Sequence, residues 1–377
     1  MITIKDAVGK CSRLGEVLAV YGWEKTVIYC ERYGSGHIND TFLVIVNEGK
    51  EEKKYILQRM NHDIFKDITG LMNNVSGVTS YLRNIIIREG GDPERETLNL
   101  VPDMDGKLHY TDSIGCHWRV YLFISEATTY NQVEKIEDFY QSAKAFGHFQ
   151  NLLAGYPVEK LTETIPAFHD TPKRFKDFLL AVEEDICGRA DSVREEIAFV
   201  MDRKAELGTI MELQRSGQMP YRVTHNDTKL NNIMIDDRSG EAICVIDLDT
   251  IMPGASVFDY GDSIRFGANT AAEDETDLSK VTLSLELFEA YTKGFLEGCA
   301  GKLTDIEVEM LPMGAKLMTF ECGMRFLTDY LQGDTYFKIH REMHNLDRCR
   351  CQFALVKDME EKWSEMTQIV NNCRKRI

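Results

Sequence analysis

The stretch Val223–Arg265, VTHNDTKLNNIMIDDRSGEAICVIDLDTIMPGASVFDYGDSIR, decides the fold of this chain. It holds two polar clusters, H-x-D-x4-N at 225–232 and I-D-L-D at 246–249. Short apolar runs rich in β-branched residues precede the second cluster and flank the first, and such runs between turn residues indicate buried strands. We therefore expect a polar loop carried between two strands, and Asp247 at a strand end, where its carboxylate can reach a cleft.

The side chains of these two clusters suit the transfer of a phosphoryl group. Asp227 offers a carboxylate that can accept a proton, and Asn232 and Asp247 offer the oxygen ligands that a hard cation such as Mg2+ prefers. We expect the polar loop to bring Asp227, Lys229 and Asn232 close to Asp247. A cation held there would bridge phosphate oxygens.

These motifs resemble those of the aminoglycoside phosphotransferase/choline kinase superfamily, a group of protein-kinase-like enzymes that phosphorylate small molecules. The resemblance implies ATP as phosphoryl donor, Asp227 as the catalytic base and Lys229 as the residue that stabilises charge on the transferring group. It also implies that Asn232 and Asp247 hold Mg2+. The fold that follows is α+β and bilobal, with ATP bound between a small antiparallel sheet lobe and a large, mainly helical lobe that contains the catalytic β-hairpin.

Longer strings resemble bacterial N-acetylhexosamine 1-kinases over most of the chain. They are HNDTKLNN, VIDLDTIMPG, DYGDSIRFGAN, GSGHINDTF, YILQRMN and GMRFLTDYLQGDTYFK. This narrower resemblance implies a role in carbohydrate metabolism, in which the anomeric hydroxyl of N-acetylglucosamine or N-acetylgalactosamine is phosphorylated. It also implies that His37, Arg325 and Tyr336 contact the sugar, since an arginine fork and an aromatic face suit a ring rich in hydroxyl groups.

Several residues near the motifs are expected to support the site. Asp227 already fills the role of base, so His225 is interpreted as a residue that braces the loop. Asp259 matches the next aspartate of the superfamily, which braces the catalytic loop from a helix N-terminus, and Asp262 is a second candidate for this task. Asp249 either shares the metal site or turns the chain.

Three other functions are compatible with the same motifs. A kinase for choline, homoserine or an aminoglycoside would share the loop and differ in its acceptor pocket, and the acidic surface favours a cationic acceptor. A kinase-like nucleotide-binding protein without catalysis is a second possibility, and a metal-dependent hydrolase that uses the same carboxylates is a third.

Length and composition narrow the class of protein. With 377 residues, 43% of them hydrophobic, the chain is long enough for two lobes, expected at 1–125 and 126–377. A net charge of −17 disfavours nucleic acid and anionic membranes as partners. The ten cysteines are scattered, as expected of free thiols in a reducing cytoplasm, and the N-terminus is interpreted as an amphipathic helix and not as a signal peptide. We expect a cytoplasmic monomer.

The N-terminal third has the pattern of a five-stranded antiparallel sheet. Strands are expected at Thr26–Cys30, Thr41–Val46, Lys54–Gln58, Leu108–Tyr110 and Trp118–Ile124. Between the first two strands, Gly34, Ser35 and Gly36 would let backbone N–H groups approach the phosphates of ATP. The structural alternative for this turn is an ordinary hairpin. The segment Ser125–Tyr130 is expected to form the hinge that holds adenine.

The small lobe departs from the kinase pattern at the cation that meets the ATP phosphates. The third strand offers Gln58 or Arg59 in place of a lysine, and the next helix contains no glutamate between Ile64 and Arg88 to pair with it. Arg59 can bind phosphate as a fork and is the predicted nucleotide contact. Its structural alternative is a surface arginine at a strand end.

The remainder is predicted to be mainly helical. A capping-box pattern at Thr304 opens a helix that is expected to continue through Pro312 to Leu331. Glu321, Arg325 and Asp329 recur at intervals of four on it. Such spacing usually indicates a salt-bridged face exposed to solvent, which is the structural alternative to a sugar contact for Arg325.

Overall fold

A computed structural model describes residues 13–34, 38–130, 133 and 135–376. The chain divides into two compact units. Unit 1 comprises Met1–Thr128, Glu159–Pro166 and Ile235–Ile251, and unit 2 comprises Thr129–Val158, Ala167–Met234 and Met252–Ile377. The polar stretch that decides the fold is therefore shared, with the H-x-D-x4-N loop in unit 2 and the I-D-L-D motif in unit 1.

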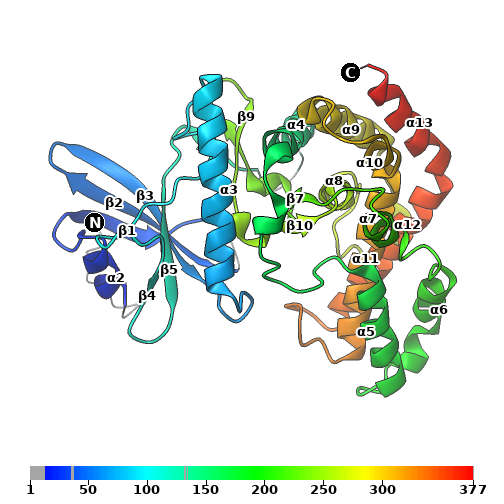
Figure 1. Ribbon diagram of the computed structural model, residues 1–377. Coiled ribbons are helices and arrows are strands. Elements are labelled where there is room, and N and C mark those ends of the chain that lie inside the picture. The colour runs from blue at the N-terminus through cyan, green and yellow to red at the C-terminus, as the bar shows by residue number, and fades with distance from the viewer. Residues whose placement is uncertain (1–12, 35–37, 131–132, 134, 377) are drawn as a thin grey trace. The chain divides into compact units, whose positions relative to one another are not determined.

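Unit 1 contains the predicted five-stranded antiparallel sheet, so this expectation is confirmed (Figure 1). The strands follow the order β1-β2-β3-β5-β4, and each pair of neighbours is antiparallel. Their bounds are β1 (Val27–Arg32), β2 (Asp40–Glu48), β3 (Glu51–Met60), β4 (Tyr110–Thr111) and β5 (His117–Leu122).

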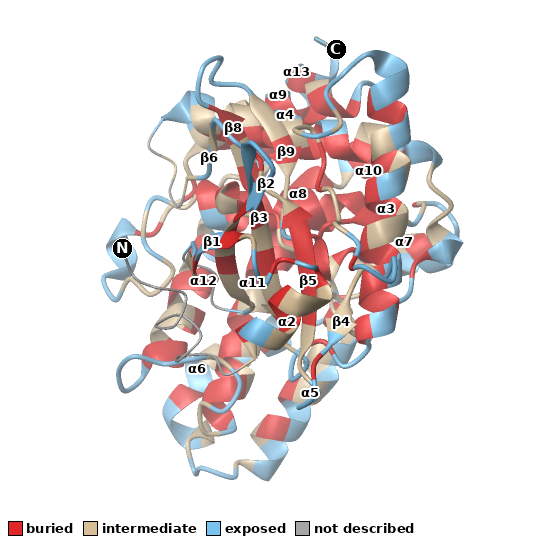
Figure 2. Cartoon of the chain, turned by 90° about the vertical axis from the view of Figure 1, so that its left-hand side faces the viewer, coloured by how far each residue is buried: buried red, intermediate tan, exposed pale blue. Residues whose placement is uncertain are grey.

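A core cluster of unit 1 lies between α2 and this sheet. Burial alternates along the middle of β2, where Phe42, Val44 and Val46 point inward, as expected of a strand with one face on the core. Helix α2 (Leu14–Val20) contributes Leu14 and Val17 to the same cluster. Figure 2 shows that β5 is buried while the tip of the β2–β3 hairpin is exposed.

Helix α3 (Ile68–Glu89) gathers the other segments of unit 1. Asp67 caps its N-terminus by accepting a hydrogen bond from the N–H of Gly70. The buried Asn74 amide donates to the carbonyl oxygens of Thr162 (2.7 Å) and Ile251 (2.9 Å). One side chain of α3 thus ties two segments that are distant in sequence to the N-terminal sheet.

Short strands flank both polar motifs. They are β6 (Ala127–Thr128), β7 (Arg222–Thr224), β8 (Ile233–Asp236), β9 (Ala242–Val245) and β10 (Met252–Gly254). The expected strands therefore lead into and out of the H-x-D-x4-N loop, but they pair with different neighbours. β7 pairs with β10, whereas β8 lies between β6 and β9.

Unit 2 is mainly helical, as predicted. Helix α11 lies at its centre because α5, α8 and α12 all pack on it (Figure 1). Within the described residues, no helix is both long and apolar enough to cross a lipid bilayer. The helices are α4 (Ile136–Leu152), α5 (Thr171–Glu184), α6 (Arg194–Asp202), α7 (Thr209–Arg215), α8 (Ser256–Gly267), α9 (Leu285–Cys299), α10 (Asp305–Glu309), α11 (Leu311–Leu331), α12 (His344–Glu361) and α13 (Trp363–Arg374).

The predicted single helix from Thr304 to Leu331 is wrong, because the chain forms two helices there. The capping box at Thr304 and Glu307 opens α10 as expected, but α10 ends at Glu309. Pro312 stands in the first turn of α11. A proline has no N–H to donate to the preceding turn, and its ring fits the start of a helix better than its interior.

Glycines allow α8 and α11 to pack closely. A Cβ atom added at Gly314 would lie 2.2 Å from the carbonyl oxygen of Val257, and one added at Gly261 would lie 2.3 Å from the carbonyl oxygen of Gly314. Both obstacles are backbone atoms within helices, so they cannot rotate away. The contact that sets the position of α8 therefore requires glycine at both positions.

We predict that Gly314→Ala lowers the free energy of unfolding by about 1–3 kcal/mol, because the methyl group overpacks a contact between two backbones. The measurement is urea unfolding followed by circular dichroism. The control is Gly15→Ala in α2, where an added Cβ meets nothing within 4 Å. That change should leave the protein as stable or about 0.5–1 kcal/mol more stable. Equal effects at both positions would contradict the prediction.

Candidate active site

The H-x-D-x4-N loop follows the short strand β7. Asn226 has a left-handed backbone, with φ of 63°, which asparagine tolerates better than most residues. The loop then closes in a single 3-10 turn at Leu230–Asn232 before β8 begins. The left-handed residue redirects the chain, so that Asp227 follows directly after a sharp turn at the end of a strand.

Asp259, in the first turn of α8, holds this loop through its backbone. Its carboxylate accepts hydrogen bonds from the N–H of His225 (2.8 Å) and from the N–H of Asn226 (2.8 Å). The side-chain amide of Gln150 on α4 donates a third bond to it (3.1 Å). Burial raises the pKa of Asp259, and these hydrogen bonds and the nearby His225 act against that rise. Asp259 therefore joins α4, α8 and the loop at one buried point.

His225 is fully buried and forms part of the loop structure. Its Nδ1 atom accepts a hydrogen bond from the N–H of Asp227 (3.3 Å). The rings of Phe146 and Phe149 on α4 stand edge-on to its imidazole. These contacts fix the backbone of Asp227 and leave its carboxylate outside the packed region.

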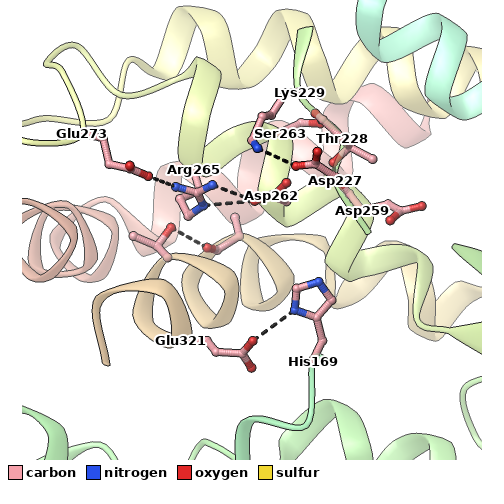
Figure 3. Close-up of polar contacts among 12 residues, drawn as sticks. His169, Asp227, Thr228, Lys229, Asp259, Asp262, Ser263, Arg265, Glu273 and Glu321 are labelled. Carbon is pink, nitrogen blue, oxygen red and sulfur yellow. Dashed lines mark hydrogen bonds and ion pairs between the residues drawn. The ribbon is translucent and has the colours of Figure 1, made fainter. Parts of the chain in front are cut away.

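Asp227 forms a compact polar cluster with Lys229, shown in Figure 3, and with Asn232. The Nζ atom of Lys229 lies 2.7 Å from Oδ1 of Asp227. The amide nitrogen of Asn232 donates to the backbone oxygen of Asp227 (2.8 Å) and to its Oδ2 (3.2 Å). Burial lowers the pKa of Lys229, but the carboxylates of Asp227 and Asp262 raise it by more. The net shift of this pKa is upward, so the lysine keeps its charge.

Asp262 is one turn further along α8 and belongs to a second buried cluster, also shown in Figure 3. It pairs with Arg265 (2.9 Å), which also pairs with Glu273 (2.7 Å). The neighbouring Ser263 donates a hydrogen bond to the carbonyl oxygen of Thr228 (2.5 Å). Helix α8 therefore holds the loop at several successive positions.

Asp247 follows β9 and is exposed, as expected of a carboxylate at a strand end. Its backbone is left-handed, with φ of 58°. The carboxylate of Asp247 and the amide oxygen of Asn232 are hard oxygen ligands of the type that suits Mg2+. The hydrogen bonds that Asn232 donates to Asp227 use its amide nitrogen and not this oxygen. Among the residues that the structure describes, no three His, Cys, Asp or Glu side chains form a metal-binding group. Mg2+ needs no such group where substrate phosphates and water complete its shell.

Asp249 belongs to a buried ion pair. Its Oδ1 lies 2.5 Å from a terminal nitrogen of Arg119 on β5, and both side chains are almost completely buried. Its Oδ2 accepts a hydrogen bond from the amide of Asn39 (2.7 Å). Of the two interpretations offered by the sequence, these contacts favour Asp249 as a residue that fixes the chain.

Sequence reasoning did not identify Arg119 as a residue of the site. Its guanidinium also donates to Oε1 of Gln58 (3.1 and 2.9 Å), so one of the two β3 side chains considered for phosphate binding faces Arg119. The signal was present, because Arg119 interrupts the apolar run Trp118–Ile124. A charged residue within such a run is buried only with a partner.

The predicted nucleotide contacts are placed only in part. Gly34 has a left-handed backbone, with φ of 77°, whereas Ser35, Gly36 and the predicted sugar contact His37 lie outside the described residues. Arg59 forms an ion pair with Asp40, the first residue of β2. The cation on β3 thus has a carboxylate partner from the neighbouring strand in place of a helical glutamate.

The predicted sugar contacts Arg325 and Tyr336 line one cavity in unit 2, with a volume of about 300 Å³. The guanidinium of Arg325 lies 5.8 Å from the ring centre of Tyr336 and 5.3 Å from that of Phe337. Tyr336 is 69% exposed. The cavity and the exposed ring of Tyr336 lie beside α5 and α11. A ligand can therefore reach both Arg325 and Tyr336.

The expectation of a salt-bridged, solvent-exposed face on α11 is wrong for Glu321 and Asp329, which are buried. Glu321 binds His169 (3.0 Å, Figure 3) and Thr171 (2.5 Å) at the start of α5. Asp329 accepts hydrogen bonds from the backbone N–H groups of residues 335–337 at 2.7–2.9 Å. Both carboxylates therefore organise the cavity walls from inside.

Comparison with known proteins agrees with this geometry. Residues 103–287 match the model of the APH family, described as the phosphotransferase enzyme family. This region contains the H-x-D-x4-N loop, the I-D-L-D motif and Asp259. The match covers the predicted catalytic motifs and does not identify the acceptor.

Solved structures of kinases share the fold across nearly the whole chain. An aminoglycoside phosphotransferase from Alicyclobacillus acidocaldarius has a TM-score of 0.60 at 13% identity, covering 94% of this chain and 96% of its own. Amicoumacin kinase hAmiN in complex with AMP-PNP, Ca2+ and Ami gives 0.59 at 13%, covering 95% of both chains. Choline kinase from Cryptosporidium parvum Iowa II gives 0.55 at 15%, covering 96% and 97%. At these identities the similarity shows the α+β kinase-like fold alone.

We predict that Arg119→Met lowers the free energy of unfolding by about 3–5 kcal/mol, because it leaves Asp249 as a buried charge without its cation. Chemical denaturation followed by tryptophan fluorescence measures the loss.

The double variant Arg119→Met with Asp249→Asn serves as the control. It removes both charges and keeps an oxygen that can accept the hydrogen bond from Asn39, so most of the lost stability should return. If the double variant is as unstable as the single one, packing around Arg119 and not charge pairing explains the loss.

Proposed function

We propose that this protein is an ATP-dependent kinase that phosphorylates the anomeric hydroxyl of N-acetylhexosamines, yielding the sugar 1-phosphate. The observation that carries the proposal is the cluster of Asp227, Lys229 and Asn232, anchored by Asp259 within a region of the phosphotransferase family. The cavity at Arg325 and Tyr336 supports a small oxygen-rich acceptor.

In the proposed reaction, the carboxylate of Asp227 accepts the proton of the acceptor hydroxyl as that oxygen attacks the γ-phosphorus of ATP in line. Before the reaction, Lys229 forms an ion pair with Asp227. During the transfer, it stabilises the negative charge on the transferring phosphoryl group. Because phosphoryl transfer needs little covalent help from the protein, positioning and electrostatic stabilisation by these residues supply most of the rate enhancement.

Asn232 and Asp247 are the proposed ligands of Mg2+, which when bound neutralises charge on the phosphates of ATP. Gly34, Ser35, Gly36 and Arg59 are the proposed contacts of the nucleotide. The relative solved with AMP-PNP and Ca2+ supports the use of a nucleoside triphosphate with a divalent cation.

The proposed sugar contacts are Arg325, Tyr336 and His37. The ring of Tyr336 offers an apolar face to the C–H groups of a sugar, and Arg325 offers hydrogen-bond donors to the N-acetyl carbonyl. The cavity of about 300 Å³ is at the lower end of the range for small-molecule sites, which favours a monosaccharide over a large antibiotic.

An amino-alcohol kinase is the second candidate. The cavity also carries the acidic residues Asp177, Glu184 and Asp329 in its walls, and similar folds occur in a choline kinase and an aminopropanol kinase. Carboxylates near a cationic acceptor would favour its binding.

A panel of acceptors distinguishes these functions. We expect ATP consumption, read by coupled ADP release, with N-acetylglucosamine or N-acetylgalactosamine and much less with glucose, choline or no acceptor. Release of an acid-labile sugar 1-phosphate, seen by 31P NMR, identifies the anomeric position. Turnover with choline alone would favour the second candidate, and ADP release without acceptor would indicate a hydrolase.

We predict that Asp227→Asn lowers kcat by about 10²–10⁴-fold, the range for loss of a general base, while nucleotide binding persists. Asp247→Ala should abolish Mg2+-dependent nucleotide binding, measured by titration calorimetry. The control is Asp191→Asn, at a surface position 88% exposed, which should change neither quantity. Full activity of Asp227→Asn would reject the assigned base, and a normal nucleotide titration of Asp247→Ala would reassign the metal ligand.

A further inference from the structure

The cavity between α5 and α11 contains two arginines that are not engaged by carboxylates. Arg174 on α5 and Arg325 on α11 both line it. Arg174 donates to the carbonyl oxygen of Phe168 (3.0 Å), and Arg325 lies against the rings of Tyr336 and Phe337. Within the described part of the chain, neither guanidinium has a carboxylate oxygen within 4.0 Å.

The acidic residues of the same cavity already have other partners or lie at its far end. Asp177 pairs with Lys173 at 2.7 Å. Asp329 accepts hydrogen bonds from three backbone N–H groups and from Asn345. Glu184 is exposed at the last residue of α5, which places it about 15 Å along the helix axis from Arg174. Glu321 and Asp177 act on Arg174 from a distance, but among the described residues no carboxylate forms an ion pair with it.

Arg174 also carries an unsatisfied donor. Its Nε atom is buried and has no hydrogen-bond partner among the described residues. Burial and the charge of Arg325 lower the pKa of Arg174, and the carboxylates of Glu321 and Asp177 act against that decrease. Two cations that face one space repel each other, and an oxyanion in the cavity that meets the guanidinium of Arg174 relieves this repulsion.

We propose that the α5–α11 cavity contains an oxyanion subsite at Arg174, which holds a carboxylate or phosphate group carried by the acceptor sugar. This inference rests on the proposed function only in taking the cavity as the acceptor site. Tyr336 and Arg325 hold the ring, and Arg174 determines specificity by receiving the anionic substituent. An acidic monosaccharide therefore binds more tightly than its neutral counterpart.

The test compares glucose with glucuronic acid, which differ only in a hydroxymethyl and a carboxylate group at one carbon. Binding of each is measured by titration calorimetry at low ionic strength without nucleotide, so the result does not depend on turnover. We expect the full-length protein to bind glucuronate at least about tenfold more tightly, the effect of one charge-assisted hydrogen bond. Arg174→Gln should abolish this preference and leave the affinity for glucose within about twofold.

The matched control is Lys176→Gln, which removes a positive charge from an exposed position on the same helix and outside the cavity lining. It should keep the preference for glucuronate. A thermal unfolding scan of each variant verifies folding, and Arg174→Lys tests geometry, since it keeps the charge but loses the planar fork. An equal loss in Lys176→Gln and Arg174→Gln would show a general charge effect and overturn the assignment.

The outcomes separate this inference from the proposed function. Equal affinity for the two sugars, together with turnover of N-acetylglucosamine, overturns the oxyanion subsite alone. Arg174-dependent binding of glucuronate without turnover of any sugar overturns the kinase assignment alone. A third titration uses inorganic phosphate. If phosphate binds with the same dependence on Arg174 and glucuronate does not, the ligand is a free anion and the sugar-borne group is rejected.

Discussion

The carboxylate of Asp259 is the constraint on which the candidate active site depends. It accepts hydrogen bonds from the backbone N–H groups of His225 and Asn226, the residues at the left-handed turn before Asp227. A buried N–H group without an acceptor would cost about 1–3 kcal/mol, so the turn is stable only while α8 supplies this carboxylate. Asp227 is the next residue, and its position follows from that anchor.

The I-D-L-D motif uses the same principle in unit 1. Asp249 is buried against Arg119 and Asn39, whereas Asp247, two residues earlier, is exposed in a left-handed conformation. In both places a buried carboxylate, Asp259 or Asp249, holds backbone or a buried cation, and a second carboxylate, Asp227 or Asp247, is more exposed.

Much of the fold was predictable because local patterns agree with the tertiary structure. Alternating apolar residues located the five strands of unit 1, and the capping box located the start of α10. The break at Pro312 was missed because the apolar spacing continues across it. Spacing alone also placed Glu321 and Asp329 on a solvent-exposed face, since i, i+4 periodicity cannot distinguish a solvated face from one covered by α5 and by the loop at 335–337.

The network of Arg119, Gln58 and Asp249 was beyond sequence reasoning for a different reason. Its members come from β3, from β5 and from the segment after β9, and only strand pairing brings them together. Without knowledge of its neighbour in the sheet, Gln58 is a reasonable candidate for phosphate binding. Motifs within one loop are predictable because their geometry is local, whereas charge partners across a sheet depend on register.

The α5–α11 cavity is built differently from the H-x-D-x4-N loop. Asp329, buried on α11, accepts hydrogen bonds from the backbone N–H groups of residues 335–337. These bonds fix the loop so that the ring of Tyr336 is exposed to solvent beside Arg325. Glu321, two turns earlier, fixes the start of α5, from which Arg174 projects to the same cavity. Because these anchors are separate from Asp259, changes at exposed cavity positions can alter the cavity without disturbing Asp227. The H-x-D-x4-N loop and the α5–α11 cavity thus have separate structural supports.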